Sequence, residues 1–280
     1  MSSGPLSAGV VRVIQGNGEV DGKPVLPPVI ELAWGLRERT GRGTRRGLSL
    51  ERVVAAGIKV ALTEGIGALS MARVAAELGA ATMSLYRYVA AKDELLTLMV
   101  DTAIGSPPAS VLDQMGWRAG LTAWAEGVRT TYRRHPWALR VPISAPPLGP
   151  NNISWLEAAL RALAETPLPD ARKLRTVTLI SFFVRSEVTL DLDLMAARAG
   201  TADERPSAPD YGAMLAQLTD PLHFPALHRV IASGGFEGDK DPDAQFSYGL
   251  ECILDGVEAL IRKTSAARSR PARPARPSRT

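Results

Sequence analysis

Apolar and polar positions alternate with a helical period along most of the chain. Apolar residues recur at i, i+3, i+4 and i+7, the spacing that places them on one face of a helix. The pattern predicts helices over residues 49–65 and 92–105. Beyond residue 109 it predicts no strand, and it predicts helices over 117–135, 152–165, 170–198, 211–218, 225–233 and 243–263. The sequence therefore predicts an all-α fold.

The helix starts carry recognisable caps, whereas the first 36 residues carry little pattern. Ser49 and Asn152 each precede a helical run, and both side chains are suited to accept an orphan amide of the first turn. Further upstream, Gly-Asn-Gly at 16–18 lies between β-branched residues, which is typical of a hairpin turn. Residues 28–36 offer one apolar turn. Disorder is the alternative for both stretches.

The segment 70–89, SMARVAAELGAATMSLYRYV, predicts two short helices joined by a tight turn. Met71, Val74 and Leu78 lie on one face of the first helix. Gly79 follows at once, and glycine just past a helical run favours a left-handed C-cap. Two helices so joined indicate a helix-turn-helix, and an ordinary helical hairpin is the alternative.

The second helix of this segment divides its residues between two sides. At about 100° per residue, its inner side carries Ala81, Leu85 and Tyr88. The other side carries Thr82, Met83, Tyr86 and Arg87. Hydroxyl and guanidinium groups can bond base edges and phosphates, and a methyl group can contact thymine. This side is therefore suited to read a major groove.

Composition places the chain among ordinary globular proteins. It has 280 residues, 45% of them hydrophobic and 22% charged. A chain of this length can form a hydrophobic core that needs no disulfide or metal cross-links. No apolar run is long enough for a membrane span, and the N-terminus lacks the pattern of a secretory signal. The single cysteine, Cys252, fits a reducing compartment. We expect a cytoplasmic protein.

The net charge of +4 is distributed unevenly. Residues 37–46 hold five Arg and one Glu, and residues 262–280 hold six Arg, one Lys and no acid, so the remainder is acidic. The first stretch, a glycine-rich arm, either contacts DNA or is a solvated linker. Its basic residues are Arg37, Arg39, Arg42, Arg45 and Arg46. The second is expected to be disordered.

No motif in the sequence indicates catalysis or metal binding. His223 and His228 are five residues apart around a proline, which does not match a helical zinc pair. Asp191 and Asp193 are two apart on a predicted helix, so their side chains point in different directions. Neither a P-loop, nor a dinucleotide fingerprint, nor a nucleophile elbow is found. We expect no cofactor, no metal and no enzyme activity.

Aromatic side chains are scattered over the predicted helices after residue 109. Some of them either line a cavity for a flat organic ligand, with a polar side chain nearby, or belong to the core. The candidate ligand residues are Trp124, Tyr132, Trp137, Trp155, Phe182, Phe183, Arg185 and His223.

The block from Leu48 to Gly105 resembles the TetR family of bacterial transcriptional repressors. The resemblance rests on the lead-in TEGIGALSM and on the motifs VAAELG, MSLYRYV and KDELL. RRHPWALRV at 133–141 and FSYGLECILDGVEALI at 246–261 are similar to the tetracycline-repressor type of regulatory domain found in actinobacteria.

This resemblance implies a homodimeric repressor that binds a palindromic operator on double-stranded DNA and is released by a small molecule. It implies DNA contacts over the helix-turn-helix, from Ser70, Met71, Arg73, Thr82, Met83, Ser84, Tyr86, Arg87, Tyr88 and Lys92. Tyr88 lies toward the core on the helical wheel. Ala72 stands where the family often has a DNA-contacting Arg, which argues against the tetracycline operator. A regulator without a small-molecule ligand and a helical enzyme are the alternatives.

The resemblance also implies an intersubunit four-helix bundle built from the helices over 170–198 and 243–263. Independently, the first of these is apolar on more than one face. The candidate interface residues are Phe246, Leu250, Ile253, Leu254 and Val257. The predicted domains are the extension and arm (1–46), the DNA-binding domain (47–107), the regulatory and dimerisation domain (108–263) and the tail (264–280).

Overall fold

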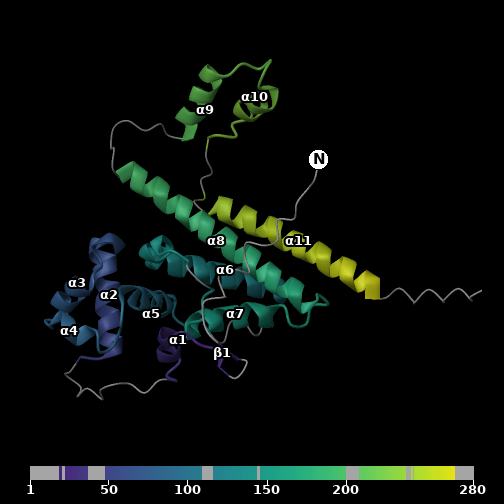
Figure 1. The fold of residues 1–280 in the computed structure, drawn as a ribbon. Coiled ribbons are helices and arrows are strands. Elements are labelled where there is room, and N and C mark those ends of the chain that lie inside the picture. The colour runs from purple at the N-terminus through teal and green to yellow at the C-terminus, as the bar shows by residue number, and fades with distance from the viewer. Residues whose placement is uncertain are drawn as a thin grey trace, which may run out of the picture. The chain divides into compact units, whose positions relative to one another are not determined.

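The computed structural model of the chain describes residues 19–20, 23–36, 48–108, 116–143, 146–199, 208–237, 241 and 243–268. Over these ranges the chain forms eleven α-helices, two 3-10 helices and one pair of two-residue strands (Figure 1). Strand β1 (Glu19–Val20) pairs antiparallel with β2 (Lys23–Pro24). The Gly-Asn-Gly stretch at 16–18, where the sequence indicates a turn, lies outside the described residues. The prediction of an all-α fold is confirmed.

The chain divides into two compact units, Met1–Val177 and Thr178–Thr280. The first unit joins the predicted DNA-binding domain to the helices that follow it, and the second holds most of the long helix α8 (Asp170–Ala199) and all later elements. None of the helices in the described ranges is long and apolar enough to cross a membrane.

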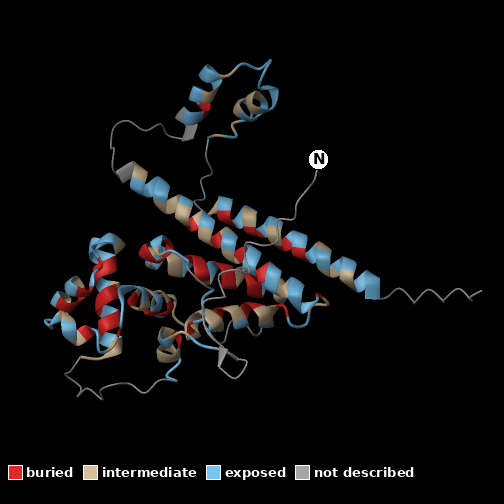
Figure 2. Ribbon diagram, viewed as in Figure 1, coloured by how far each residue is buried: buried red, intermediate tan, exposed pale blue. Residues whose placement is uncertain are grey.

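The head, residues 48–104 of the predicted DNA-binding domain, packs its helices around one apolar core (Figure 2). Its elements are α2 (Leu50–Glu64), η2 (Ile66–Ala68), α3 (Met71–Glu77), α4 (Thr82–Leu85) and α5 (Lys92–Ile104). Ser49 caps α2 as predicted, because its hydroxyl accepts the amide of Arg52 at 3.3 Å. The fully buried members of the core are Val53, Val60, Leu69, Val74, Leu85, Val89, Leu95 and Met99.

The short helix α1 (Pro28–Ala33) packs against this head. Ile30 is buried, and Leu32 packs against the core of the head. The indole of Trp34 donates a hydrogen bond to the carbonyl of Leu148 at 2.8 Å. Residues 28–36 are therefore an ordered part of the first unit, which the sequence left undecided.

Helices α6 (Trp117–Arg134) and α7 (Pro150–Ala162) pack against each other through two tryptophans. The rings of Trp124 and Trp155 meet edge to face at 6.3 Å, and the Trp124 indole donates to the carbonyl of Trp155 at 2.8 Å. The chain passes from α6 to α7 through the 3-10 helix η4 (Pro136–Arg140).

The predicted cap of α7 is wrong. The helix begins after Gly149 with Pro150 in its first turn, so Asn152 lies inside the helix. Proline suits this position because its missing amide would be unpaired there in any case. The amide of Asn152 instead bonds a carboxylate of another helix.

The second unit contains α9 (Ala208–Leu218), α10 (Pro225–Ala232) and α11 (Ala244–Arg268), together with α8 from Thr178 onward. Phe183 stacks on Phe246 with ring centroids 5.5 Å apart. Gly249 makes room for this ring, because a Cβ there would lie 2.6 Å from a ring carbon of Phe183. Helix α11 continues to Arg268, five residues beyond its predicted end at 263.

Candidate nucleic-acid interface

The helix-turn-helix forms where the sequence predicts it. The hydroxyl of Ser70 accepts the amide of Arg73 at 3.1 Å and caps α3. Gly79 takes φ = +62°, a left-handed conformation that glycine adopts without strain, and so lets the chain turn into α4. Leu85 and Val89 are buried and anchor α4 to the head. These local features fix the direction of the recognition helix.

One side of α4 faces outward, as its pattern predicts. Met83 is 76% exposed and Tyr86 is 44% exposed, and Arg87 is exposed beside them. Thr82 and Ser84 are half-buried at the edges of this side. Lys92, at the start of α5, is exposed as well. We call these six residues, Thr82, Met83, Ser84, Tyr86, Arg87 and Lys92, the reading face.

Ala81 and Tyr88, both predicted to face inward, behave differently. Ala81 is the N-cap of α4 and is exposed, because it precedes the first full turn. Tyr88 is half-buried, and its hydroxyl donates to the carbonyl of Leu48 at 2.7 Å. The guanidinium of Arg87 lies 5.9 Å from the centre of the Tyr88 ring. Tyr88 therefore ties the end of the recognition helix to the start of the head.

Two further residues named as DNA contacts have structural roles within the head. Met71 is 7% exposed and belongs to the core. Arg73 donates to both carboxylate oxygens of Glu64, at 3.0 and 3.1 Å from Nε, and to Glu77 at 3.0 Å. The side chains of these residues hold α3 in the head, so the reading face leaves both out.

The charges around Arg73 form a network across α2 and α3. Lys59 on α2 pairs with Glu77, which also accepts from Arg73. The hydrogen bonds from Lys59 and then Arg73 hold the pKa of Glu77 below its usual range, while those to Glu64 and then Glu77 raise the pKa of Arg73. The network therefore favours the charged forms of Glu77 and Arg73.

The eight candidate ligand residues are divided between the two units. Trp124 and Trp155 are buried between α6 and α7, and Trp137 is buried against the core of the head. In the second unit Phe182 is 63% exposed, and the His223 ring nitrogen lies 2.9 Å from Asp220. The remaining three, Tyr132, Phe183 and Arg185, are half-buried. Trp137 thus helps to close the head, a role that the sequence did not indicate.

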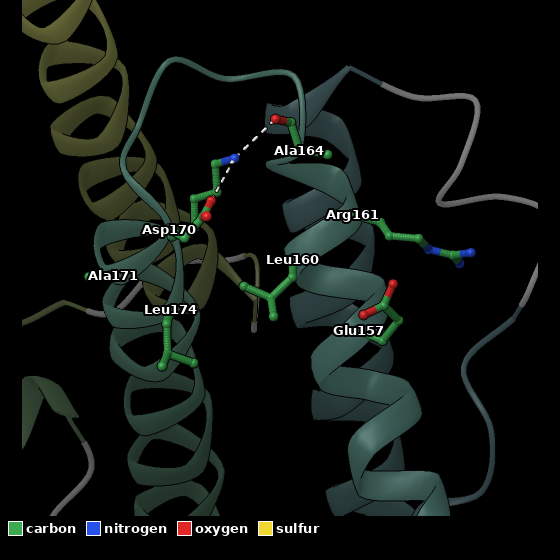
Figure 3. A pocket seen from close by; sticks show the side chains of 8 residues that line it. Glu157, Leu160, Arg161, Ala164, Asp170, Ala171 and Leu174 are labelled. Carbon is green, nitrogen blue, oxygen red and sulfur yellow. Dashed lines mark hydrogen bonds and ion pairs between the residues drawn. The ribbon is translucent and has the colours of Figure 1, made fainter.

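An open groove of about 540 Å³ lies between α7 and the first turn of α8 (Figure 3). Leu160 points from α7 toward α8, and Leu174 lies on the α8 side. Lys173 closes one end by donating to the carbonyl of Ala164 at 3.0 Å and pairing with Asp170 at 3.3 Å. None of the candidate ligand residues lines this groove. Nowhere in the described ranges do three His, Cys, Asp or Glu side chains gather as metal ligands would.

The candidate interface residues on α11 lie mainly inside the single chain. Phe246, Leu250, Leu254 and Val257 are each at most 4% exposed, and Ile253 is half-buried. Side chains that are already covered within one chain offer a partner little surface, so the interface on α11 stays a prediction and the exposed apolar side chains are better placed for one. The exposed apolar side chains of the two long helices are Leu174, Leu179, Phe182, Leu190, Leu194 and Met195 on α8 and Tyr248 and Leu260 on α11.

Comparisons with known proteins agree with this geometry. Residues 53–99 match the family model "Bacterial regulatory proteins, tetR family", and residues 110–261 match "Tetracyclin repressor-like, C-terminal domain". The chain is 38% identical over 256 residues to the HTH-type transcriptional repressor DrrR1 of Streptomyces coeruleorubidus. This match covers 88% of this chain and 90% of DrrR1. It is 28% identical over 239 residues to the HTH-type transcriptional repressor Rv1353c of Mycobacterium tuberculosis, covering 83% and 88%.

Among solved structures, apo ActR of Streptomyces coelicolor is similar to this chain with a TM-score of 0.61 and 28% identity. The match covers 79% of this chain and 98% of ActR. The complex of ActR with actinorhodin matches with a TM-score of 0.61 and 27% identity, covering 77% and 99%. The chain therefore belongs to the TetR family of bacterial regulatory proteins: it is a DNA-binding transcriptional regulator.

Proposed function

We propose that this regulator is a cytoplasmic repressor that binds a palindromic operator through its reading face and is released by a small organic molecule. The observation that carries the DNA-binding part is the outward side of α4, where Met83, Tyr86 and Arg87 project while Leu85 anchors the helix behind them.

Each part of the reading face has a chemistry that suits DNA. Arg87 can donate two parallel hydrogen bonds to guanine, and Tyr86 can bond a phosphate or a base edge. Met83 and the methyl group of Thr82 can contact the thymine methyl group. Ser84 and Lys92 can donate to phosphates on either side. A dimer would present two such faces to half-sites about one helical turn, 34–36 Å, apart.

The proposed ligand is a flat organic molecule. ActR has been solved with actinorhodin and with (S)-DNPA. In this chain Trp124 and Trp155 form an aromatic pair between α6 and α7. Actinorhodin is therefore the first probe. Binding should raise the melting temperature and weaken operator binding, because a ligand that prefers one state shifts the equilibrium toward it. A regulator controlled by a partner protein would show neither effect.

The proposed dimer interface is the exposed apolar stripe of α8, formed by Leu179, Phe182, Leu190 and Leu194. At about 100° per residue these four side chains lie within roughly one third of the helix circumference. Ile180, Val184 and Val188 are fully buried on the opposite side. A helix with two apolar sides is typical of one that packs in its own chain and also against another chain.

The arginines of the arm at 37–46 lie outside the described residues, and their contact with DNA remains a proposal. Deleting residues 1–46 would also remove α1, whose Ile30 is buried in the first unit. Replacing the five arginines by Gln is therefore the cleaner test. If the arm neutralises phosphates, the slope of log affinity against log salt should become shallower by about 0.9 for each phosphate that the variant leaves unneutralised.

The reading face is tested on an operator selected from a random DNA pool. Arg87→Ala and Tyr86→Ala should each weaken operator binding by about 1–3 kcal/mol and random-DNA binding by less, because base contacts carry the specificity. Arg229→Ala, an exposed arginine of α10, is the matched control and should leave binding unchanged. Full operator affinity in both reading-face variants would refute the proposed interface.

A further inference from the structure

A buried carboxylate joins the last turn of α5 to the first turn of α7. Asp101 is 5% exposed, although the first turn of the same helix carries the exposed acid Asp93. Leu95, Leu98 and Asp101 follow one another at intervals of three residues, so Asp101 lies on the same buried side of α5 as the two leucines. An acid in this place requires partners, because a buried charge without them is very costly.

The partners of Asp101 all come from the first turn of α7. One carboxylate oxygen accepts the backbone amide of Asn152 at 3.0 Å and its side-chain amide at 2.8 Å. The other accepts the backbone amide of Asn151 at 3.3 Å and its side-chain amide at 3.1 Å. The Asn151 side chain also donates to the main-chain carbonyl of Asp101 at 3.0 Å. Asp101 thus caps α7 from another helix, at the end where the helix dipole favours a negative charge.

The surrounding residues fit closely around this cap. A Cβ on Gly149 would lie 2.1 Å from a carboxylate oxygen of Asp101, so a larger residue there would displace the carboxylate. The indole of Trp155 on α7 donates to the carbonyl of Gly105, the residue that ends α5, at 2.8 Å. The two helices are therefore fixed to each other by polar contacts on both sides of Asp101.

The position of α5 matters because this helix completes the head. Leu95 and Met99 are fully buried in the same core as Val53 of α2 and Leu85 of α4. A change in the direction of α5 therefore moves the recognition helix together with the head, because packed cores shift as units.

We propose that Asp101 is a positioning residue for operator binding: by capping α7 it fixes the angle between the head and the helices α6 and α7. This inference rests on the proposed reading of a palindromic operator by α4. In this proposal, the contact between Asp101 and the first turn of α7 determines where the reading face of each subunit meets its half-site.

The first test is Asp101→Asn, which keeps the size of the side chain but replaces one acceptor oxygen by a donor. Two donors of α7 would then face another donor, and the joint would loosen. Operator affinity should fall by about 2- to 30-fold, the range expected when a residue that couples two sites is replaced. Asn152→Ala removes one side-chain donor and leaves the backbone amides in place, so it should give a smaller loss in the same direction. It also serves if Asp101→Asn does not fold.

The decisive readout is the preference for half-site spacing. Each variant is measured on the selected operator and on operators with one base pair added or removed between the half-sites. If Asp101 fixes the angle of the head, the variants should lose affinity for the natural spacing and discriminate less against the altered ones. A merely structural role would lower the melting temperature and leave the ratio between spacings unchanged, and that result would overturn the inference.

Glu157→Gln is the matched control, because it removes one negative charge from an exposed position of α7. It should keep the spacing preference of the unmodified chain. A double-mutant cycle between Asp101→Asn and Asn152→Ala should be non-additive, since the two side chains share one hydrogen bond. If no operator could be selected for the unmodified chain, the proposed function would be refuted. If both variants kept the spacing preference, only the positioning role of Asp101 would be refuted.

Discussion

The DNA-binding head and the second unit differ in how completely they bury their apolar side chains. In the head, helices of only 4 to 15 residues meet around one core, and Val53, Leu85 and Leu95 are fully buried. In the second unit, α11 buries Leu250, but α8 leaves Phe182 63% exposed. Large exposed apolar side chains in a row mark an interaction surface. The head is complete in one chain, whereas the long helix leaves an apolar side uncovered.

This difference separates the tasks of the two regions. A head with a closed core can present α4 in a fixed direction, which base reading requires. A helix with an uncovered apolar side has its natural partner in the same surface of a second chain, because a two-fold interface brings identical patches together. This difference can be tested by substitutions of covered and of uncovered apolar side chains, which should affect stability and dimerisation respectively.

The largest effect is expected from Phe182→Glu on the uncovered side of α8. Hot-spot aromatic residues contribute about 2–4 kcal/mol each, and a two-fold interface contains the residue twice. The variant should be a folded monomer with its helical content intact and with operator binding abolished. Light scattering and circular dichroism measure the two properties. A stable dimer would place the interface elsewhere.

Leu250→Ala on the covered side of α11 should act on stability instead. Truncating a fully buried leucine costs about 2–5 kcal/mol, because it loses transfer free energy and leaves a cavity. Leu250 is 3% exposed within one chain. Denaturant unfolding at several protein concentrations separates this loss from dissociation. If Leu250→Ala changed only the concentration dependence, then Leu250 would belong to the interface after all.

Two tyrosines of the head sharpen the comparison on a smaller scale. Tyr88→Phe removes the hydrogen bond to Leu48 and should lower the free energy of unfolding by about 0.5–1.5 kcal/mol, with little change in specificity. Tyr86→Phe should leave stability unchanged and weaken operator binding, because the Tyr86 side chain is exposed. Thermal melts and binding titrations on both variants check this. If instead Tyr86→Phe lowered the free energy of unfolding and Tyr88→Phe weakened operator binding, the roles assigned to the two hydroxyl groups would be wrong.

The smallest effect is a pH dependence that originates at His135, where α6 ends. Burial, and then the charge of Arg134, lowers the pKa of His135 below its usual value of 6.5. The unfolded chain therefore binds a proton more readily, so the free energy of unfolding should fall as the pH drops below 6.5 toward the folded-state pKa. His135→Gln should show a shallower decline between pH 7 and pH 5 in denaturant titrations. Identical slopes would exclude this contribution.

Local signals in the sequence were enough to place most of the head. Ser49, Ser70 and Gly79 each act within three or four residues of their own position, so their effect can be read without the fold. The same holds for the outward side of α4, where the wheel separated Tyr86 from Leu85. Caps and periodicity depend on chemistry that the sequence states directly.

The errors concern interactions between segments far apart in the chain. The apolar stripe of α11 is visible in the sequence, but periodicity cannot say whether the same chain or a partner covers it, and Leu250 is already covered within one chain. Asp101 was missed because its partners follow 50 residues later. The one available signal was an acid in step with Leu95 and Leu98 on an apolar face.

The central claim is that two chains read one palindromic site through the reading faces of their α4 helices. The most direct measurement is selection of bound DNA from a random pool, followed by the mass of the complex formed on the selected site. The account predicts an inverted repeat, with half-sites one helical turn or a multiple of it apart, bound by two chains or by a whole number of such pairs. A selected site without two-fold symmetry, or a complex that contains one chain per site, would contradict it.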